Sequence, residues 1–214
     1  MINLKINGQD VSVPEGYTVL DAAREVGINI PTLCYLKDLN QIGACRMCLV
    51  EIKGARALQA ACVYPVAEGI EVFTNSEKVR KARKTTLELI LSNHERKCLT
   101  CIRNRNCELQ KLADELGVED IPFEGENIKY DIDDASESLV RDNNNCILCR
   151  RCIAACDNQE VSVISCVNRG FSTEVAAAFG KDMSEVGCIY CGQCIVACPV
   201  GALYEKTHIP KVQA

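Results

Sequence analysis

The sequence predicts an α+β fold that is divided among several small units and braced by metal sites. Three observations support this prediction: helix-like and strand-like patterns are mixed along the chain, aromatic side chains are scarce, and cysteines are abundant. Aromatic residues make up only 5% of the 214 residues, and there is no Trp, although large cores usually depend on aromatic side chains for buried area. The sixteen cysteines offer another means of stabilisation.

The first unit, residues 1–75, is expected to be a β-grasp arrangement, in which a helix packs on a mixed sheet. Alternating apolar residues flank Asn7-Gly8, which is the strongest short hairpin signal. Thr18 then caps a helix that Gly27 ends. Further strands are expected at residues 49–52, 57–62 and 70–73.

The second unit, residues 76–117, is expected to be helical. Ser76 opens a helical pattern that continues to about Asn93, and a second helix is expected over residues 107–116. The first of these helices carries five basic side chains. We expect them to form a solvated helix face, and a docking surface for an acidic partner is the alternative. The five side chains are Lys78, Arg80, Lys81, Arg83 and Lys84.

The rest of the chain divides into a linker and a third unit. Residues 118–142 are acidic and have few periodic apolar positions, so we expect a linker there. Residues 143–214 are expected to form a ferredoxin-like unit, because they contain a cysteine repeat.

Three interpretations of the cysteines compete: disulfides, zinc and iron–sulfur clusters. Disulfides need an oxidising compartment, but the N-terminus has no charged segment followed by an apolar one, as a secretory signal would. No apolar run approaches the roughly 20 residues that span a membrane. We therefore expect a cytoplasmic protein without a membrane span, whose cysteines bind metal. A net charge of −5 gives no reason to expect a nucleic-acid partner.

The cysteine repeat predicts two [4Fe–4S] clusters. Each copy has the pattern Cys-x2-Cys-x2-Cys-x3-Cys, and in such runs three cysteines bind one cubane while the fourth reaches the other. One predicted ligand set is therefore Cys146, Cys149, Cys152 and Cys198. The other is Cys188, Cys191, Cys194 and Cys156. Zinc would give no reason for this eight-cysteine symmetry.

The two copies of the repeat differ in the residue after their last cysteine. Asp157 stands there in the first copy, whereas Pro199 stands there in the second. A long insert separates the copies, and it is expected to contain a hairpin over residues 161–175 that turns at residues 168–170.

The N-terminal set has the spacing Cys34-x10-Cys45-x2-Cys48-x13-Cys62. The plant-type [2Fe–2S] pattern has only four residues between its first two cysteines, so this spacing is a variant. Spacing alone leaves four-cysteine zinc open, and the β-grasp context favours [2Fe–2S]. Small residues at 43–44 would let backbone N–H groups approach the sulfide.

The third set is His94-x3-Cys98-x2-Cys101-x5-Cys107. His94 completes a four-ligand set for a third [4Fe–4S] cluster, and a zinc site with the same residues is the competing interpretation. A neutral imidazole in place of a thiolate makes the cluster less negative and should raise its potential. Of the remaining candidates, Cys166 is expected to be a buried structural cysteine, and His208 is expected to lie on the surface.

Taken in order, these constellations resemble the N-terminal iron–sulfur region of iron-only hydrogenases. They are also similar to the matching segment of the large iron–sulfur subunit of complex I and of NAD-linked formate dehydrogenases. The likeness covers nearly the whole chain, and residues 30–36, 43–51 and 198–203 carry it. It implies one [2Fe–2S] cluster and three [4Fe–4S] clusters on the ligand sets described above.

The resemblance implies an electron-transfer subunit with no catalytic residues of its own. The sequence has no nucleotide-binding glycine motif and no flavin signature, and it stops at Ala214, before the catalytic domain of a hydrogenase or a formate dehydrogenase. We expect it to relay electrons between a flavin and NAD(P) subunit and a hydrogenase or formate dehydrogenase catalytic subunit, with electron bifurcation one form of such a complex.

Two alternatives remain open at this point. In the first, the chain is the cluster-bearing N-terminal part of an iron-only hydrogenase or of an NAD-linked formate dehydrogenase, without the catalytic domain. In the second, it is a zinc-stabilised interaction scaffold.

Overall fold

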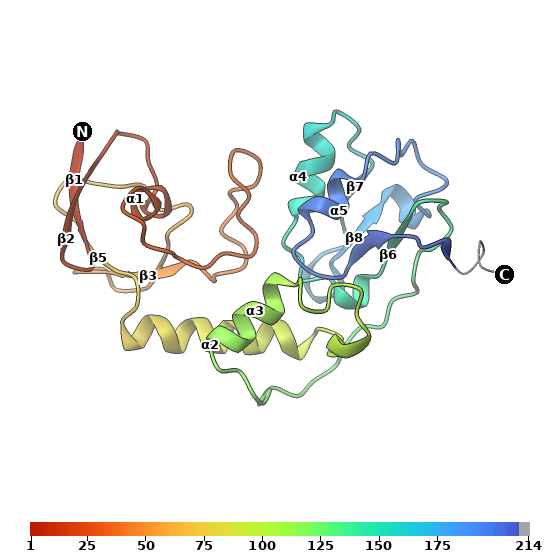
Figure 1. Ribbon diagram of the computed structural model, residues 1–214, viewed down its shortest axis with the longest axis horizontal. Helices are drawn as coiled ribbons and strands as arrows, with labels where there is room; N and C mark the ends of the chain where they lie inside the picture. The colour runs from red at the N-terminus through yellow and green to blue at the C-terminus, as the bar shows by residue number, and fades with distance from the viewer. Residues whose placement is uncertain (210–214) are drawn as a thin grey trace.

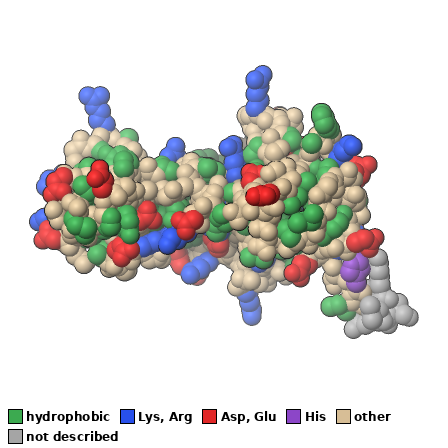
Figure 2. Space-filling model, turned by 90° about the horizontal axis from the view of Figure 1, so that it is seen from above, with side chains coloured by type: hydrophobic (Ala, Val, Ile, Leu, Met, Phe, Trp, Pro, Cys, Tyr) green, Lys and Arg blue, Asp and Glu red, His purple; other side chains and the backbone are tan. Residues whose placement is uncertain are grey.

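The computed structural model describes residues 1–209, in which a sheet near the N-terminus is joined by two helices to a second half of short helices and two-stranded sheets (Figure 1). Mixed α and β structure was expected and is present. The charged side chains of both signs are interspersed over the face shown in Figure 2, and neither sign gathers into one large patch there.

The N-terminal sheet has five strands in the order β2-β1-β5-β3-β4. Strand β1 (Ile2–Ile6) pairs with β2 (Gln9–Val13) in antiparallel fashion and with β5 (Glu71–Phe73) in parallel fashion. Strand β3 (Leu49–Ile52) is antiparallel to both β5 and β4 (Gln59–Ala60). The sheet is therefore mixed, as the sequence predicted.

The first hairpin confirms the Asn7-Gly8 signal. Ile6 pairs with Gln9, so Asn7 and Gly8 form a two-residue turn, with φ of 53° and 85°. Both angles are positive, as this kind of hairpin turn requires, and asparagine and glycine adopt them at low cost.

The strand predicted over residues 57–62 is wrong in its length. Only Gln59–Ala60 pair with β3, because the chain turns directly afterwards. Val63 and Tyr64 both donate backbone hydrogen bonds to the carbonyl of Ala60. The turn ends the strand just before Cys62.

Helix α1 (Val19–Glu25) packs its apolar face on the sheet. Thr18 and Asp21 form a capping box, in which each side chain accepts a hydrogen bond from the other's backbone N–H. Val19, Leu20 and two alanines of the helix are buried in a core with the sheet strands.

Helix α2 (Glu77–Ser92) follows the predicted cap, Ser76. One of its five basic residues does not lie on the solvated face that the sequence predicted. Lys78, Arg80 and Lys81 are exposed, whereas Arg83 is buried and only 5% accessible. Arg83 lies four residues from both Val79 and Leu87, so it shares their buried face. The prediction of a solvated face is therefore wrong for Arg83.

The second half contains two small antiparallel sheets and two short helices. Strands β6 (Leu139–Arg141) and β9 (Leu203–Glu205) form one sheet. Strands β7 (Ile164–Val167) and β8 (Glu174–Ala177) form the other, which confirms a hairpin in the insert, although both of its strands lie somewhat later than predicted. Helix α3 (Glu108–Glu115) precedes this half, and helices α4 (Arg151–Asn158) and α5 (Gln193–Ala197) lie within it.

Four single-turn 3₁₀ helices complete the secondary structure of the described residues. They are Cys98–Thr100, Asn143–Asn145, Gly170–Ser172 and Ala178–Gly180. The first begins at the predicted ligand Cys98, and the second ends directly before the predicted ligand Cys146. The last two belong to the insert between the two copies of the repeat.

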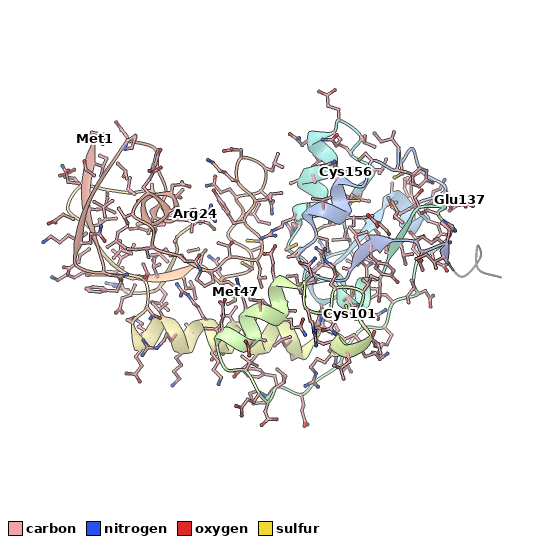
Figure 3. The ribbon with its side chains drawn as sticks, in the orientation of Figure 1. Met1, Arg24, Met47, Cys101, Glu137 and Cys156 are labelled. Atoms are coloured by element: carbon pink, nitrogen blue, oxygen red, sulfur yellow. The ribbon has the colours of Figure 1, made fainter. Side chains whose placement is uncertain are left out.

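A second hydrophobic core joins the two halves. It contains Leu87 of α2, Leu109 of α3 and Leu139 of β6, and it also contains Leu33 and Met47 from the N-terminal loops. Leu33 and Met47 have no accessible surface. Met47 lies close to α3 in Figure 3. The loops that carry the first cysteine set are therefore packed into the core of the second half.

A buried ion pair lies within the acidic segment 118–142, and its arginine is hydrogen-bonded to the hairpin of the insert. Arg141 Nη2 lies 3.1 Å from Asp133 Oδ2, and the Arg141 side chain also donates to the carbonyl of Val175. Asp133 accepts a further hydrogen bond from the backbone of Met183. Both partners of the pair are buried, so each depends on the other.

Among residues 1–209, the structure has no helix that is both long enough and apolar enough to cross a membrane.

Replacing one partner of the buried pair should destabilise the fold. Arg141→Met leaves Asp133 buried without its counter-ion, and we expect the free energy of unfolding to fall by about 3–5 kcal/mol. Anaerobic urea denaturation measures the change. As a matched control, Lys53→Met removes the exposed Lys53–Glu71 ion pair and should change the free energy by no more than about 1 kcal/mol. Equal losses in the two variants would contradict a structural role for the buried pair.

Candidate metal centres

The two copies of the cysteine repeat adopt the same backbone conformation. In the first, Leu148 and Arg150 have φ of 52° and 61°. In the second, Tyr190 and Gly192 occupy the matching positions, with φ of 55° and 74°. This left-handed conformation costs on the order of 1–3 kcal/mol for a residue other than glycine, so it persists only where its surroundings enforce it.

The left-handed turns direct backbone N–H groups at cysteine sulfur. The Leu148 amide donates to Cys146 Sγ at 3.4 Å, and the Tyr190 amide donates to Cys188 Sγ at 3.5 Å. Helices α4 and α5 start directly after these turns. Amide donors to sulfur stabilise thiolates and tune the metal they bind. Sequence reasoning found the cysteines but missed these residues, although the repeat itself aligns them.

The first set of the repeat lines a single cavity. Its thiol lining is Cys146, Cys149, Cys152 and Cys198. Burial raises the pKa of Cys152 well above its usual range. Repulsion from the neighbouring thiolates raises it further, and the largest contributions come from Cys149, Cys146 and Cys198. The structure thus brings together the four residues that the spacing grouped, including the cysteine from the other copy of the repeat.

The second set of the repeat is brought together in the same way. Burial raises the pKa of the Cys194 thiol to about 11, with further contributions from Cys188, Cys156 and Cys191. Cys156 comes from the end of α4, in the first copy, and reaches the set from the second copy. Of these four, Cys191 is exposed, so this set lies nearest to solvent at that residue.

The thiols of the N-terminal set lie close together. The Sγ atoms of Cys48 and Cys62 are 3.3 Å apart, and the amide of Cys34 donates to Cys45 Sγ at 3.3 Å. Hydrogen bonds from the neighbouring thiols of Cys45 and Cys62 lower the pKa of Cys34 to about 2. The backbone amides of Cys45 and Ala44 lower it as well, whereas burial acts in the opposite direction. Cys34 is therefore the member of the set that most favours the thiolate.

The loop that carries Cys45 and Cys48 turns tightly around this set. Gly43 and Arg46 have φ of 60° and 57°. A Cβ atom on Gly43 would lie 3.1 Å from a methyl group of Val63, so both the conformation and the space favour glycine. The Ala44 amide donates to the Cys34 thiol, which places a backbone donor beside this set.

A buried arginine lies beside the N-terminal set. Arg83 Nη2 donates to the carbonyl of Leu49 at 2.6 Å, and no salt bridge of Arg83 is present among residues 1–209. Burial lowers its pKa to about 10, and the Cys48 thiolate opposes that shift. At neutral pH Arg83 is thus a fixed positive charge next to this thiol set. The four-residue spacing of Arg83 from both Val79 and Leu87 is the sequence signal that predicts its position on the buried face of the helix.

The His94 set lines a second cavity. The lining includes His94, Cys98, Cys101 and Cys107, which are the four predicted residues. Burial lowers the pKa of His94, and the backbone of Asn145 opposes this by accepting a hydrogen bond. The imidazole is therefore neutral at pH 7, which is the form that binds metal.

One nitrogen of His94 is left without a protein partner. The Nδ1 atom is buried and has no hydrogen-bond partner among residues 1–209. Buried polar atoms are rarely unsatisfied, and a missing ion is one explanation of such an atom. A lone pair on a cavity-lining imidazole, together with three thiols, fits a metal-bound group.

A close approach joins the His94 set to the end of the cysteine repeat. A Cβ atom on Gly201 would lie 2.7 Å from Cys101 Sγ, so only glycine fits there. Arg103 donates to the carbonyl of Cys198 at 2.6 Å, and Glu108 donates through its backbone to Pro199. Cys101 and Cys156 nevertheless lie well apart in Figure 3, so the His94 set and the second set of the repeat occupy different parts of the molecule.

Two remaining candidates lie outside these sets. Cys166, on β7, is half-buried rather than buried, and the cavities of the first repeat set and of the His94 set do not include it. The His208 ring contacts the carbonyl of Glu137 at 2.8 Å in an exposed position. Within the described part of the chain, no three His, Cys, Asp or Glu side chains converge closely enough to hold a single metal ion.

The four sets fit iron–sulfur clusters by the chemistry of their donors. Three sets offer four thiols each and one offers three thiols with an imidazole. Amide groups donate to Cys34, Cys45, Cys146 and Cys188. A cluster bound there would supply one-electron redox chemistry, while the residues hold it and set its surroundings.

Three family descriptions match separate parts of the chain. Residues 1–77 match a "2Fe-2S iron-sulfur cluster binding domain". Residues 83–122 match the "NADH-ubiquinone oxidoreductase-G iron-sulfur binding region", and residues 186–204 match a "4Fe-4S binding domain". The mixed α and β structure therefore contains both 2Fe-2S and 4Fe-4S binding domains.

Whole-chain comparisons agree with these matches. The chain is 44% identical, over 99% of its length, to an NADP-reducing hydrogenase subunit from Solidesulfovibrio fructosivorans. It is 39% identical, over 96% of its length, to the alpha subunit of an NADPH-Fe(3+) oxidoreductase from Geobacter sulfurreducens. It spans 37% and 24% of the lengths of these two relatives.

A solved structure matches the chain over almost its full extent. A chain in the crystal structure of an NAD+-reducing [NiFe]-hydrogenase in the H2-reduced state superimposes with a TM-score of 0.90 at 30% identity. The match covers 97% of the present chain and 88% of the other.

Exchanging the histidine ligand should shift one reduction potential. His94→Cys adds a thiolate to the third set, and we expect that cluster to stay bound while its potential falls by on the order of 100 mV. Potentiometric titration followed by electron paramagnetic resonance measures the change. Cys166→Ser, outside the sets, should leave the potential of the His94 cluster unchanged. An unchanged potential in His94→Cys would show that His94 is not a ligand.

Removing the buried charge should act on a different centre. Arg83→Met takes a positive charge from beside Cys48, so the reduced, more negative centre of the N-terminal set loses stabilisation. We expect its potential to fall by tens of millivolts, up to about 100 mV. Arg80→Met, on the same helix but exposed, is the matched control and should have little effect. A fall of the same size in both variants would contradict a local role for Arg83.

Proposed function

Because the chain belongs to the iron–sulfur electron-transfer subunits of NAD(P)-linked hydrogenases and related oxidoreductases, we propose that it relays electrons between a flavin and NAD(P)-binding subunit and a hydrogenase catalytic subunit. The observation that carries the proposal is the match to the NAD+-reducing hydrogenase structure, which covers most of both chains. Two of these related proteins, from separate comparisons, combine a nicotinamide cofactor with hydrogenase in their names.

The proposed cofactors are one [2Fe–2S] cluster and three [4Fe–4S] clusters. The [2Fe–2S] cluster is assigned to Cys34, Cys45, Cys48 and Cys62. The first [4Fe–4S] cluster is assigned to His94, Cys98, Cys101 and Cys107. The paired clusters are assigned to Cys146, Cys149, Cys152 and Cys198, and to Cys188, Cys191, Cys194 and Cys156. The cavities and thiol groupings described above support these sets.

The proposed domain division follows the clusters. Residues 1–75 form a β-grasp [2Fe–2S] domain, residues 76–117 a helical His/Cys3 domain, residues 118–142 a linker, and residues 143–214 a ferredoxin-like domain with two [4Fe–4S] clusters. The matched ranges support the first two boundaries. Strand β6, at the end of the linker, pairs with β9, so its packing lies with the last domain.

The cytoplasm is the proposed compartment. All sixteen cysteines are free in the structure, and thiols stay reduced, and available to clusters, where the compartment is reducing.

A second candidate function has one observation in its favour. The Solidesulfovibrio relative is longer than this chain, which spans 37% of it. The same cluster-bearing region therefore also occurs as part of a larger polypeptide, and this chain would then act as the corresponding part of an iron-only hydrogenase. The composition of the natively purified complex distinguishes the two, because the relay function requires a catalytic subunit that is a separate polypeptide, whereas the second candidate requires the catalytic domain on the same polypeptide.

Iron analysis and an activity assay on one preparation test the proposal. The anaerobically reconstituted chain should bind about 14 iron and 14 acid-labile sulfide per molecule, which is the total for the four proposed clusters. It should pass electrons from photoreduced deazaflavin to cytochrome c and evolve no hydrogen from reduced methyl viologen.

The variant Cys149→Ala tests the relay through one cluster. It should lose about four iron per chain and slow the reduction of cytochrome c. Stoichiometric zinc in place of iron, or hydrogen evolution by the chain alone, would contradict the proposed function.

A further inference from the structure

One side chain connects two of the candidate metal centres. Asn40 lies in the loop between Cys34 and Cys45 and is only 5% accessible. Its Nδ2 atom donates to the carbonyl of Cys34 at 2.7 Å and to the carbonyl of Cys149 at 3.0 Å. Cys34 belongs to the N-terminal set and Cys149 to the first set of the repeat. A single amide nitrogen thus bridges two ligand loops that are far apart in the sequence.

The chemistry of the bridge requires an amide. Both partners are carbonyl oxygens, which only accept hydrogen bonds, so the side-chain atom between them must be a donor with two hydrogens. Two such bonds from one nitrogen keep the two oxygens within about 6 Å of each other. A carboxylate at the same position would have no hydrogen to give and would repel both carbonyls.

The loop is built to present this side chain. Leu36 and Asn40 exchange two backbone hydrogen bonds, of 2.9 and 2.8 Å, and Asp38 at the tip has φ of 61°. The ten-residue spacing between Cys34 and Cys45 provides the chain length for this extra turn. Two apolar residues of the loop, Leu39 and Ile42, are exposed, so they do not anchor it. The buried anchor of the turn is Asn40.

The surroundings of the bridge are closed to solvent and already bring the two sets near each other. Leu33 precedes Cys34 and Met47 precedes Cys48, and both have no accessible surface within the core of the second half. Packing therefore sets the approach of the two loops, and the Asn40 amide fixes their register.

We propose that Asn40 is a positioning residue that fixes the separation between the [2Fe–2S] ligand loop and the [4Fe–4S] ligand loop that contains Cys149. This inference rests on the proposed function, because it requires both clusters. One electron crosses this junction at a time: the donor is oxidised by one electron, the acceptor is reduced by one, and no bond breaks. Asn40 takes no part in that change, and acts by holding the two carbonyls in place.

Two variants remove the bridge in different ways. Asn40→Leu keeps a similar volume and removes the donor, whereas Asn40→Asp keeps the shape and replaces the donor with a negative charge. If one variant fails to fold, the other still tests the proposal. The matched control is Asn144→Leu: Asn144 Nδ2 donates to the carbonyl of Tyr130 and to Asp142, near the same cluster but away from the junction.

The measurements are made on the full chain with its clusters reconstituted. Iron content and the separate cluster signals come first. Pulsed electron paramagnetic resonance then measures how strongly the reduced [4Fe–4S] cluster enhances the spin relaxation of the [2Fe–2S] cluster, which depends on their separation. Amide hydrogen exchange measures the opening of residues 146–150.

The bridge predicts a specific pattern. Both Asn40 variants should keep the iron content of the wild type, lose part of the relaxation enhancement, and exchange the amides of residues 146–150 roughly tenfold faster, the factor for one lost hydrogen bond. Asn144→Leu should keep the wild-type enhancement. Unchanged enhancement and exchange in both Asn40 variants, with clusters present, would overturn the inference. Absence of both cluster signals from the wild type would overturn the proposed function itself.

Discussion

A buried thiolate is costly unless positive charge or hydrogen bonds compensate it, and this chain buries cysteines in both its N-terminal half and its second half. In the protein alone, burial raises the pKa of Cys146 to about 12 and that of Cys149 to about 11, so these groups are neutral at pH 7. Cluster binding reverses this balance, because the metal takes the thiolate and releases the proton. Much of the folding free energy of the second half therefore depends on what its cysteines bind.

This dependence explains the local conformations around the sites. Leu148 and Tyr190 accept a strained backbone because their amides then reach sulfur, and Gly201 is required because Cys101 leaves no room for a Cβ atom. The same sites hold the halves together, since Leu33 and Met47 beside the first cysteine set are buried in the second core. Ligand loops and core packing are thus one structural unit.

Sequence spacing grouped the cysteines into four sets, because a cluster demands fixed steps between its ligands, and the cavities and neighbouring thiols of the structure support these sets. The exchange of Cys156 and Cys198 between the two repeat copies and the Asn7-Gly8 hairpin both followed from local rules. Arg83 and Asn40 were missed, because their roles depend on contacts with Leu49 and Cys149 that only the folded chain creates. The strand at residues 57–62 was overestimated, since propensity does not reveal the turn after Ala60.

The central claim is that four separate iron–sulfur clusters occupy four defined ligand sets. Anomalous diffraction from crystals grown without oxygen, recorded on both sides of the iron and of the zinc absorption edges, tests it most directly. We expect four iron peaks, one in each set, with Cys198 bound together with Cys146, Cys149 and Cys152, and with His94 bound at the third. A peak at the zinc edge in any set, or no iron between His94 and Cys101, would contradict it.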